Sequence, residues 1–397
     1  MKILRWILKA IAALAAAIIT SLVVLLLTIW VADPAVLRNL LLGQSPTDPA
    51  GVAKSQPQET VRGNLRDDFV VGEPVGIDPS GIAAAEAYAE KTESVALLVY
   101  HRGVLVHEKY WRGFDRDTRT NPNSMHKTVL ALLIGAAIAD GKIDSLDTPA
   151  SKWLTEWQGD ARRDITVRDL LQMSSGLEIP IFGTWKSARI LFGSNLEQGT
   201  MGLQAERPHG NYFQYSNANS QLLLIMLERA VGQRYSEYFS GRLWQRMGAV
   251  DAALWMDREG GLPRGFCCLF ASGRDWLRVG RLILDQGRVG DDQVVPATWI
   301  AQMLTPAKTN PNFGLHIWLG SPPKQQRPYN DYAVKAFHSE PFAAADIAYI
   351  DGFGGQRGYV VPSLQLVIVR TGKSKTDWDD AILPNAIIRA VRPAGAP

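Results

Sequence analysis

"SMHKTVLALLIGAAIADGKI", residues 124–143, is the stretch that decides how this chain folds. Its apolar residues continue nearly all round a helix over roughly Ser124 to Asp140, which predicts a helix buried on most of its faces. Ser124 and Lys127 stand three residues apart at its front, so a helix would place both side chains on one face. The pair is either an ordinary polar helix start or a nucleophile with its proton acceptor.

Composition sets the broad class of the chain. Its 397 residues can form one large domain or two smaller ones with a real core, and a net charge of +3 gives no electrostatic reason to expect nucleic acid. The two cysteines, Cys267 and Cys268, are adjacent and cannot easily reach normal disulfide geometry, so we expect two small core residues. The six histidines show no metal-binding spacing, and we expect no metal or other cofactor.

The N-terminus predicts a membrane anchor. Residues 1–9 carry only positive charges, and residues 10–32 carry none and are long enough to cross a bilayer. Positive charge before the apolar run predicts a cytoplasmic N-terminus and a periplasmic domain on a single-pass inner-membrane protein. The alternative is a cleaved signal peptide and a secreted protein, although Asp33-Pro34 is a poor cleavage context.

Beyond the anchor, we expect a tether over residues 33–67 and one folded domain over residues 68–397. Helical patterns in the middle of this domain are flanked by strand-like runs nearer its ends. The predicted elements are a hairpin at 94–113 turning at Arg102-Gly103, helices at 165–177, 216–232 and 272–287, two strands within 348–372, and a helix within 379–391. This order predicts an α+β fold, with an antiparallel sheet from both chain ends, flanking helices and an inserted helical region.

Ser124 and Lys127 have the residue types for acyl transfer. A serine hydroxyl is a weak nucleophile unless a base takes its proton, and lysine can be that base if burial lowers its pKa. The bare spacing is not specific, because it recurs at residues 321–324. Two prolines there predict a loop instead of a helix.

Two further motifs follow along the chain. Tyr215 of "YSN", residues 215–217, could pass a proton to a leaving group if a nearby ammonium lowered its pKa, and Asn217 could orient the lysine or a substrate carbonyl. A buried tyrosine and an asparagine helix cap are the structural alternatives. In "DGFGGQRG", residues 351–358, the glycines would let a strand aim an N–H at a carbonyl oxygen, or would simply form a turn.

In this order, the three motifs resemble those of the penicillin-recognising serine hydrolases. The likeness covers residues 96–371 and is strongest to class C β-lactamase-like proteins and to the branch of 6-aminohexanoate-dimer hydrolases and esterases. It implies a β-lactamase/transpeptidase-like fold and covalent catalysis without a cofactor.

The resemblance also implies a role for each motif residue. Ser124 would be acylated, Lys127 would activate it, and Tyr215 would assist proton transfer. Asn217 matches the third position of the Tyr-x-Asn motif. The oxyanion hole would combine the N–H of Ser124 with one from the strand Gly352–Gly354, most plausibly that of Phe353.

The third motif departs from the family's lactam- and peptide-cleaving members. They carry Lys-Thr-Gly or His-Thr-Gly where this chain has Ile350-Asp351-Gly352. A cation there would pair with a substrate carboxylate, whereas an inward-pointing Asp351 would repel one. Arg357 is a possible substitute. We therefore expect a small-molecule ester, amide or peptide-like substrate in preference to a β-lactam or a D-Ala-D-Ala peptide.

Other functions remain open. A non-turnover module that senses cell wall or β-lactams could have the same fold, whereas a Ser-His-Asp hydrolase lacks its usual Gly-x-Ser-x-Gly signature here. Residues 178–209 hold Phe182, Trp185 and Phe192, and could be a mobile aromatic flap or a satellite core under a loop. The expected partners are the substrate and, through the N-terminal helix, the lipid bilayer.

Overall fold

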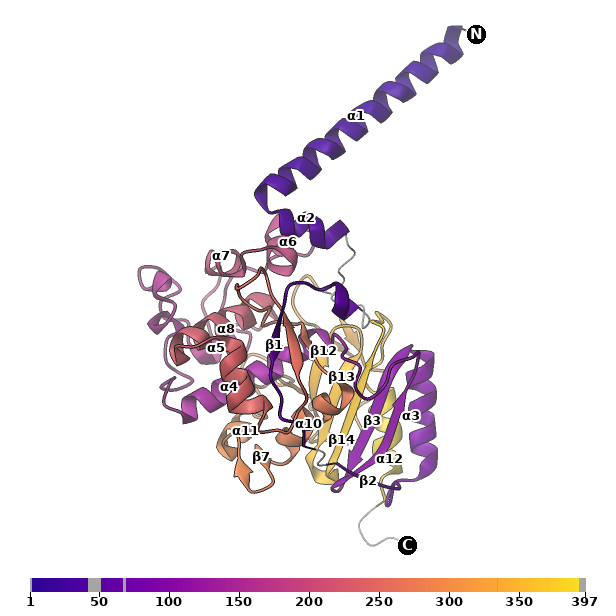
Figure 1. The fold of residues 1–397 in the computed structure, drawn as a ribbon, viewed down its shortest axis with the longest axis vertical. Coiled ribbons are helices and arrows are strands. Elements are labelled where there is room, and N and C mark those ends of the chain that lie inside the picture. Colours follow the sequence, from indigo (N-terminus) through magenta and orange to yellow (C-terminus); the bar gives the residue numbers. More distant parts are fainter. Residues whose placement is uncertain (1, 42–50, 67–68, 334, 393–397) are drawn as a thin grey trace.

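A seven-stranded sheet organises the domain in this computed structural model, which describes residues 2–41, 51–66, 69–333 and 335–392 (Figure 1). The strand order is β2-β4-β3-β14-β13-β12-β9, with only the β2–β4 pair parallel. The strands are β2 (Val70–Val71), β3 (Ser94–His101), β4 (Val104–Tyr110), β9 (Trp318–Leu319), β12 (Ala348–Gly352), β13 (Gln356–Val361) and β14 (Leu366–Gly372). Strands β3 and β14 pair at the centre although the helical region separates them in sequence, which confirms the predicted sheet from both chain ends.

Helices cover both faces of this sheet. On one face, α3 (Pro79–Lys91) packs beside α12 (Ile382–Ala390), and on the other lies α10 (Gly273–Leu284). Because side chains alternate along a strand, Leu97 and Val99 of β3 join the first layer while Leu98 joins the second. Burial on both faces explains why these strands are continuously apolar in sequence.

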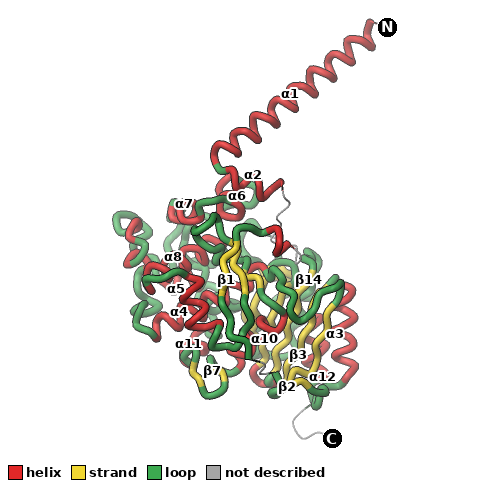
Figure 2. Tube along the Cα trace, viewed as in Figure 1, coloured by secondary structure: helices red, strands yellow, loops and turns green. Residues whose placement is uncertain are grey.

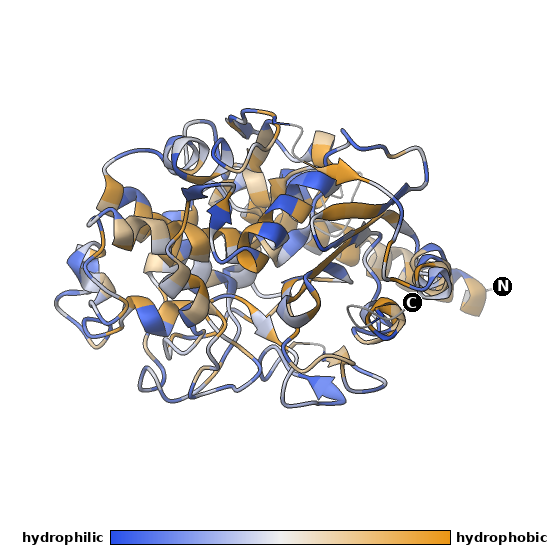
Figure 3. Ribbon diagram, turned by 90° about the horizontal axis from the view of Figure 1, so that it is seen from below, coloured by the Kyte–Doolittle hydropathy of each residue, from blue (hydrophilic) through white to orange (hydrophobic). Residues whose placement is uncertain are grey.

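The helical region lies to one side of the sheet (Figures 1 and 2). It contains α4 (His126–Ala139), α5 (Val167–Leu171), α8 (Asn217–Val231), α9 (Tyr235–Phe239) and α11 (Ala297–Met303). Helix α4 is buried from its first residue to Ala137 and packs against α8, so the predicted burial is confirmed. Hydrophobic segments gather in the interior while the outer loops are mostly hydrophilic (Figure 3).

Local signals set the ends of most elements. Ser216 caps the start of α8, and Gly232 ends it in the left-handed conformation, as expected for these residue types. Two boundaries differ from prediction. Ser124 lies in a 3₁₀ turn, Asn123–Met125, just before α4, and α5 ends at Leu171, six residues earlier than predicted.

The C-terminal strands number three, where the sequence predicted two. Gly354 and Gly355 both have positive φ, so the chain reverses there and separates β12 from β13. Pro384 is the third residue of α12, where the missing N–H would have no partner within the helix. It therefore lies in the first turn without interrupting the helix.

The predicted tether over residues 33–67 is largely wrong. Helix α2 (Pro34–Leu41) packs on α6 (Trp185–Phe192), and β1 (Gln58–Val61) pairs with β5 (Ala252–Trp255). Residues 42–50 and 67 lie outside the described part of the chain. The sequence suggested a loose segment because its buried residues are few and find their partners far along the chain.

One N-terminal helix could cross a membrane. Helix α1 (Lys2–Ala32) extends away from the domain, and residues Ile3–Ala32 are long and apolar enough for a span (Figure 1). A signal sequence at this position has the same character, so the choice between anchor and signal stays a prediction.

Candidate active site

The front of α4 presents Ser124 beside Lys127. The distance between Lys127 Nζ and Ser124 Oγ is 2.8 Å. Asn121 Oδ1 accepts the N–H of Asn123, which adopts a left-handed conformation that asparagine tolerates well. This turn leaves Ser124 partly exposed while the lysine is buried.

Lys127 has hydrogen-bond partners that suit a neutral amine. Its Nζ donates to Asn217 Oδ1 at 2.9 Å and to the Phe266 carbonyl oxygen at 2.6 Å. With Ser124 Oγ, three oxygens surround Nζ; in the neutral form of the amine, which has two N–H groups and one lone pair, the lone pair can face the Ser124 hydroxyl. Burial lowers the pKa of Lys127 well below its usual value, and the charge of Asp351 acts against that shift.

Tyr215 completes the cluster from the segment before α8. Its hydroxyl shares a hydrogen bond with Ser124, and its ring lies 4.9 Å from Lys127 Nζ. Stacking on Trp318 and edge contacts with Phe313 and Tyr329 hold the ring in place. Burial, with the Asp351 charge, raises the pKa of Tyr215 well above its usual value. The condition of a lowered tyrosine pKa is therefore not met, and the phenol keeps its proton near pH 7.

The glycine-rich hairpin lies against the turn that carries Ser124. Asn123 Nδ2 donates to the Phe353 carbonyl oxygen at 3.0 Å. Gly352 approaches the Pro122 carbonyl so closely that a Cβ would collide with it. The third motif thus adjoins the first, and Phe353, whose side chain is partly exposed, follows directly after this contact.

A methyl group at Gly352 is expected to push the two motifs apart. We predict that Gly352→Ala lowers kcat/KM by about 10²-fold or more, because one misplaced oxyanion donor costs that much. Gly159→Ala is the matched control, since a Cβ there meets nothing within 4 Å. The measurement is kcat/KM of both variants on one ester. An equal decrease in kcat/KM in the two variants would contradict the prediction.

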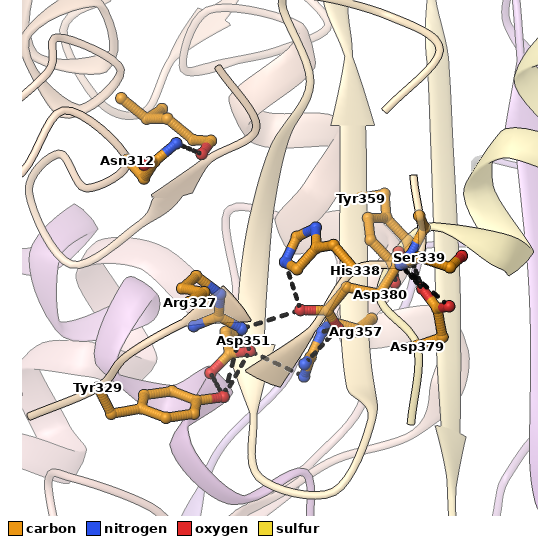
Figure 4. Close-up of polar contacts among 12 residues, drawn as sticks. Asn312, Arg327, Tyr329, His338, Ser339, Asp351, Arg357, Tyr359, Asp379 and Asp380 are labelled. Carbon is orange, nitrogen blue, oxygen red and sulfur yellow. Dashed lines mark hydrogen bonds and ion pairs between the residues drawn. The ribbon is translucent and has the colours of Figure 1, made fainter. Parts of the chain in front are cut away.

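Asp351 points into a buried ionic cluster, so the alternative in which it points toward the substrate and repels a carboxylate does not hold (Figure 4). Asp351 Oδ1 lies 2.9 Å from a guanidinium nitrogen of Arg327 and also of Arg357, and Oδ2 accepts from the Tyr329 hydroxyl at 2.9 Å. Both arginines also pair with buried Asp380. Arg357 is therefore committed to these partners and does not replace the missing substrate-binding cation.

This cluster makes Asp351 a structural residue. Removing one partner from a buried ion pair leaves an uncompensated charge, so we predict that Asp351→Ala lowers the free energy of unfolding by about 3–5 kcal/mol. Asp144 pairs with Lys152 with both side chains more than half exposed, and Asp144→Ala is expected to cost at most about 1 kcal/mol. Thermal unfolding of the two variants compares them directly, and similar midpoints would refute the structural role.

Two cysteines and one histidine are buried next to Lys127 and its partner Phe266. Cys267 and Cys268 are buried, as expected, but they are joined in a disulfide, so the expectation of two separate thiols is wrong. His126 bonds the Cys267 carbonyl oxygen and the Tyr235 hydroxyl through its two ring nitrogens. Although it stands close to Ser124 in sequence, both of its nitrogens are thus engaged elsewhere.

Residues 178–209 contain the satellite core considered for them, whereas the mobile flap stays a prediction. Ile190 and Leu196 are buried in a cluster with Phe266, which is the satellite core, whereas Phe182 is 84% exposed and Trp185 39%. The sequence did not point to Arg327, Tyr329 or Trp318 as neighbours of the site. No motif marks them, because only the tertiary structure brings β9 and the segment that follows it to Tyr215.

A metal centre is not evident in this region. Across residues 2–41, 51–66, 69–333 and 335–392, no three His, Cys, Asp or Glu side chains are grouped to hold a metal ion. The polar groups around Ser124 are an amine, an amide, a phenol and backbone carbonyls, which suit proton transfer and hydrogen bonding better than metal ligation.

Comparisons with known proteins place the chain in a family. A family model described as Beta-lactamase matches residues 82–391. The 6-aminohexanoate-dimer hydrolase of Paenarthrobacter ureafaciens is 28% identical over 235 residues, a match that covers 55% of this chain and 59% of that protein. This chain therefore spans less than two thirds of the relative's length.

Solved structures show the same fold. A Bacillus anthracis protein provisionally assigned as a 6-aminohexanoate-dimer hydrolase matches with a TM-score of 0.69 and 18% identity, over 85% of this chain and 91% of that one. EstCE1, a hydrolase with promiscuous acyltransferase activity, matches with a TM-score of 0.61 and 16% identity, over 79% and 99%. The fold is thus of the β-lactamase/transpeptidase-like class. The matched residues include six of the seven strands of the sheet, all but β2, and all three motifs. The chain belongs to the β-lactamase family of hydrolases.

Proposed function

We propose that this protein is a membrane-anchored serine hydrolase that cleaves an ester or amide through an acyl-Ser124 intermediate. The observation that carries the proposal is the buried Lys127 Nζ, which lies 2.8 Å from Ser124 Oγ and within hydrogen-bond distance of Asn217 Oδ1 and the Phe266 carbonyl oxygen. An amine held in this way can accept the serine proton.

The proposed reaction has two steps. Lys127 takes the proton from Ser124 as Oγ attacks the substrate carbonyl carbon, and the N–H groups of Ser124 and Phe353 stabilise the oxyanion. Neutral Tyr215 donates its proton to the leaving oxygen or nitrogen and regains one from Lys127 through the Ser124 position. Water then attacks the acyl-enzyme, its proton is taken by the same groups, and the acid product leaves with Ser124 restored.

The position of Asp351 supports a substrate without a carboxylate at that position. The site lacks the lysine of the Lys-Thr-Gly motif, and Arg327 and Arg357 are engaged in the buried cluster. A β-lactam or a C-terminal peptide carboxylate would therefore lose its usual ionic partner. In this mechanism an ester, or an amide such as the 6-aminohexanoate dimer for which the relative is named, needs no cation to pair with a carboxylate.

Activity is expected to increase with pH through the lowered pKa of Lys127. The amine must be unprotonated to act, so kcat/KM rises as Lys127 loses its proton and reaches its plateau well below pH 10.5, the usual lysine pKa. Because the pKa of Tyr215 is raised, loss of its proton does not limit the plateau near neutral pH. A pH profile whose acid limb coincides with the usual lysine value would contradict this mechanism.

A substrate panel tests the proposed function. The full chain in detergent, and its Ser124→Ala variant, are assayed on p-nitrophenyl esters of increasing acyl length, on the 6-aminohexanoate dimer and on a chromogenic cephalosporin. We expect Ser124-dependent turnover of esters or the amide that exceeds cephalosporin turnover. Preferred cephalosporin turnover would instead indicate a β-lactamase, and acylation without turnover on any substrate would indicate a sensing module.

A further inference from the structure

We propose that the surface around α2 and the start of α6 lies on the lipid bilayer, so that the catalytic domain rests on the membrane that α1 spans. The surface consists of Leu40 and Leu41 on α2, with Ile181, Phe182 and Trp185 at the start of α6. This inference rests on the proposed anchoring by α1 and goes beyond it. An anchor alone would allow the domain to be held at a distance.

The connection between α1 and α2 is too short for such a distance. Only Asp33 separates Ala32, the end of α1, from Pro34, the start of α2. Consecutive Cα atoms are about 3.8 Å apart, so α2 begins within about 8 Å of the end of α1. The uncharged residues 10–32 are about 35 Å long as a helix, which matches a hydrocarbon core of about 30 Å with a slight tilt. Helix α2 therefore begins at the level of the headgroups.

Hydrogen bonds fix α2 to the catalytic domain. Asp33 accepts from the Ser194 N–H at 2.9 Å and from its hydroxyl at 3.0 Å, and Asn39 Nδ2 donates to the Phe192 carbonyl oxygen at 2.7 Å. Val36 is fully buried. The membrane end of α1 and the α6 segment are thus parts of one packed unit, and Figure 1 shows α6 directly beside α2.

The exposed side chains of this unit suit a membrane interface. Leu41 is 73% exposed and Phe182 84% exposed, although both are large and apolar. Trp185, 39% exposed, is the residue type that concentrates at the boundary between headgroups and hydrocarbon. Such a group of exposed apolar residues beside a membrane helix is stabilised when it enters the interface.

The charges on the same helices are favourable as well. Helices α2 and α6 carry Arg38, Lys186 and Arg189 and no acidic residue. Lys186 pairs with Glu178, whereas the hydrogen bonds of Arg38 and Arg189 run to neutral oxygens. Basic side chains are attracted to an anionic bilayer surface. A headgroup layer is therefore complementary to this face in both polarity and charge.

This arrangement connects the membrane to the candidate active site. Buried Arg264 donates to the carbonyl oxygens of Leu191 and Gly193, at the end of α6, and lies two residues from Phe266, whose carbonyl binds Lys127. The α6 segment is thus connected to the site through Arg264 and Phe266. The substrates that such a site meets first are amphiphilic esters or amides dissolved in the bilayer.

Depth-dependent quenching tests the membrane contact without reference to activity. The full chain is reconstituted in vesicles of phosphatidylethanolamine and phosphatidylglycerol, with a bimane label on Phe182→Cys. Val71→Cys is the matched control, because Val71 is 63% exposed but β2 lies at the opposite end of the domain (Figure 1). The unsubstituted protein, treated with the same reagent, shows how much bimane reacts with Cys267 and Cys268.

Lipids that carry a doxyl group high on the acyl chain should quench the label at 182 at least about twofold more than the label at 71, given an interfacial depth of about 5–10 Å. Equal quenching at both positions would overturn the proposal, even if Ser124-dependent hydrolysis persists. Conversely, selective quenching at 182 without any hydrolysis would support the surface and reject the proposed function.

A kinetic comparison tests the consequence for substrates. Leu41→Asp is expected to lower the hydrolysis of a long-chain ester embedded in vesicles several-fold while leaving a short, water-soluble ester unaffected. An equal loss of activity on both esters, or no loss on either, would contradict delivery of substrate from the bilayer.

Discussion

Replacing Ser124 by alanine is expected to lower the hydrolysis of every substrate of this protein by about 10⁴-fold or more. The substitution removes the only atom proposed to carry the acyl group, and loss of a nucleophile that acts as one unit with its base abolishes nearly all covalent catalysis. The fold should not change, because Ser124 is partly exposed at the front of α4. The measurement is kcat on the preferred ester, together with labelling by a fluorophosphonate probe.

The chain offers a matched control for this experiment. Ser321 begins the second Ser-x-x-Lys spacing, which ends at Lys324, and both side chains are exposed. Ser321→Ala should retain full activity and full labelling. If Ser124→Ala kept its activity, or if both variants lost it equally, the proposed nucleophile would be wrong.

Replacing Lys127 by methionine is expected to lower kcat/KM by about 10²–10⁴-fold, the contribution of a well-placed general base. Methionine fills a similar volume, but its thioether cannot accept the serine proton. The acid limb of the pH profile should disappear with the lysine, because the remaining groups do not titrate in its place. The stability of the domain should hold or rise, since burying an amine costs free energy that burying a thioether does not.

Labelling separates the role of Lys127 from that of Ser124. The Lys127→Met enzyme keeps its serine, so a fluorophosphonate should still label it, but slowly, whereas Ser124→Ala should remain unlabelled. Lys324→Met serves as the control at the second motif. An unchanged pH profile in Lys127→Met would show that another group is the base, and His126, already bonded at both nitrogens, would then need to be tested.

Much of this fold follows from patterns that are local in the sequence. The apolar run of α4, the Ser216 cap and Gly232 stop of α8, and the turn at Arg102-Gly103 each depend on residues within a few positions of one another. The three motifs were found in the same way, and the structure brings Ser124, Lys127, Tyr215 and Asn217 together. Their catalytic roles remain predictions.

The features that the sequence missed depend on contacts between distant segments. The burial of Asp351 could not be predicted, because its partner Arg327 and the shared Asp380 come from distant parts of the chain. The tether was mispredicted because α2 depends on Ser194 and Phe192, more than one hundred and fifty residues away, for its hydrogen bonds. Periodicity and spacing contain no information about such pairs.

The sequence by itself thus determined the class of fold, the order of its motifs and the residue types available for acyl transfer, because short-range periodicity and caps encode them. The tertiary structure alone decided the state of those groups. Burial lowers the pKa of Lys127, and burial together with the Asp351 charge raises the pKa of Tyr215. It also decided that Asp351 faces two arginines instead of a substrate, since only packing sets which neighbours a charge meets and how much water remains around it.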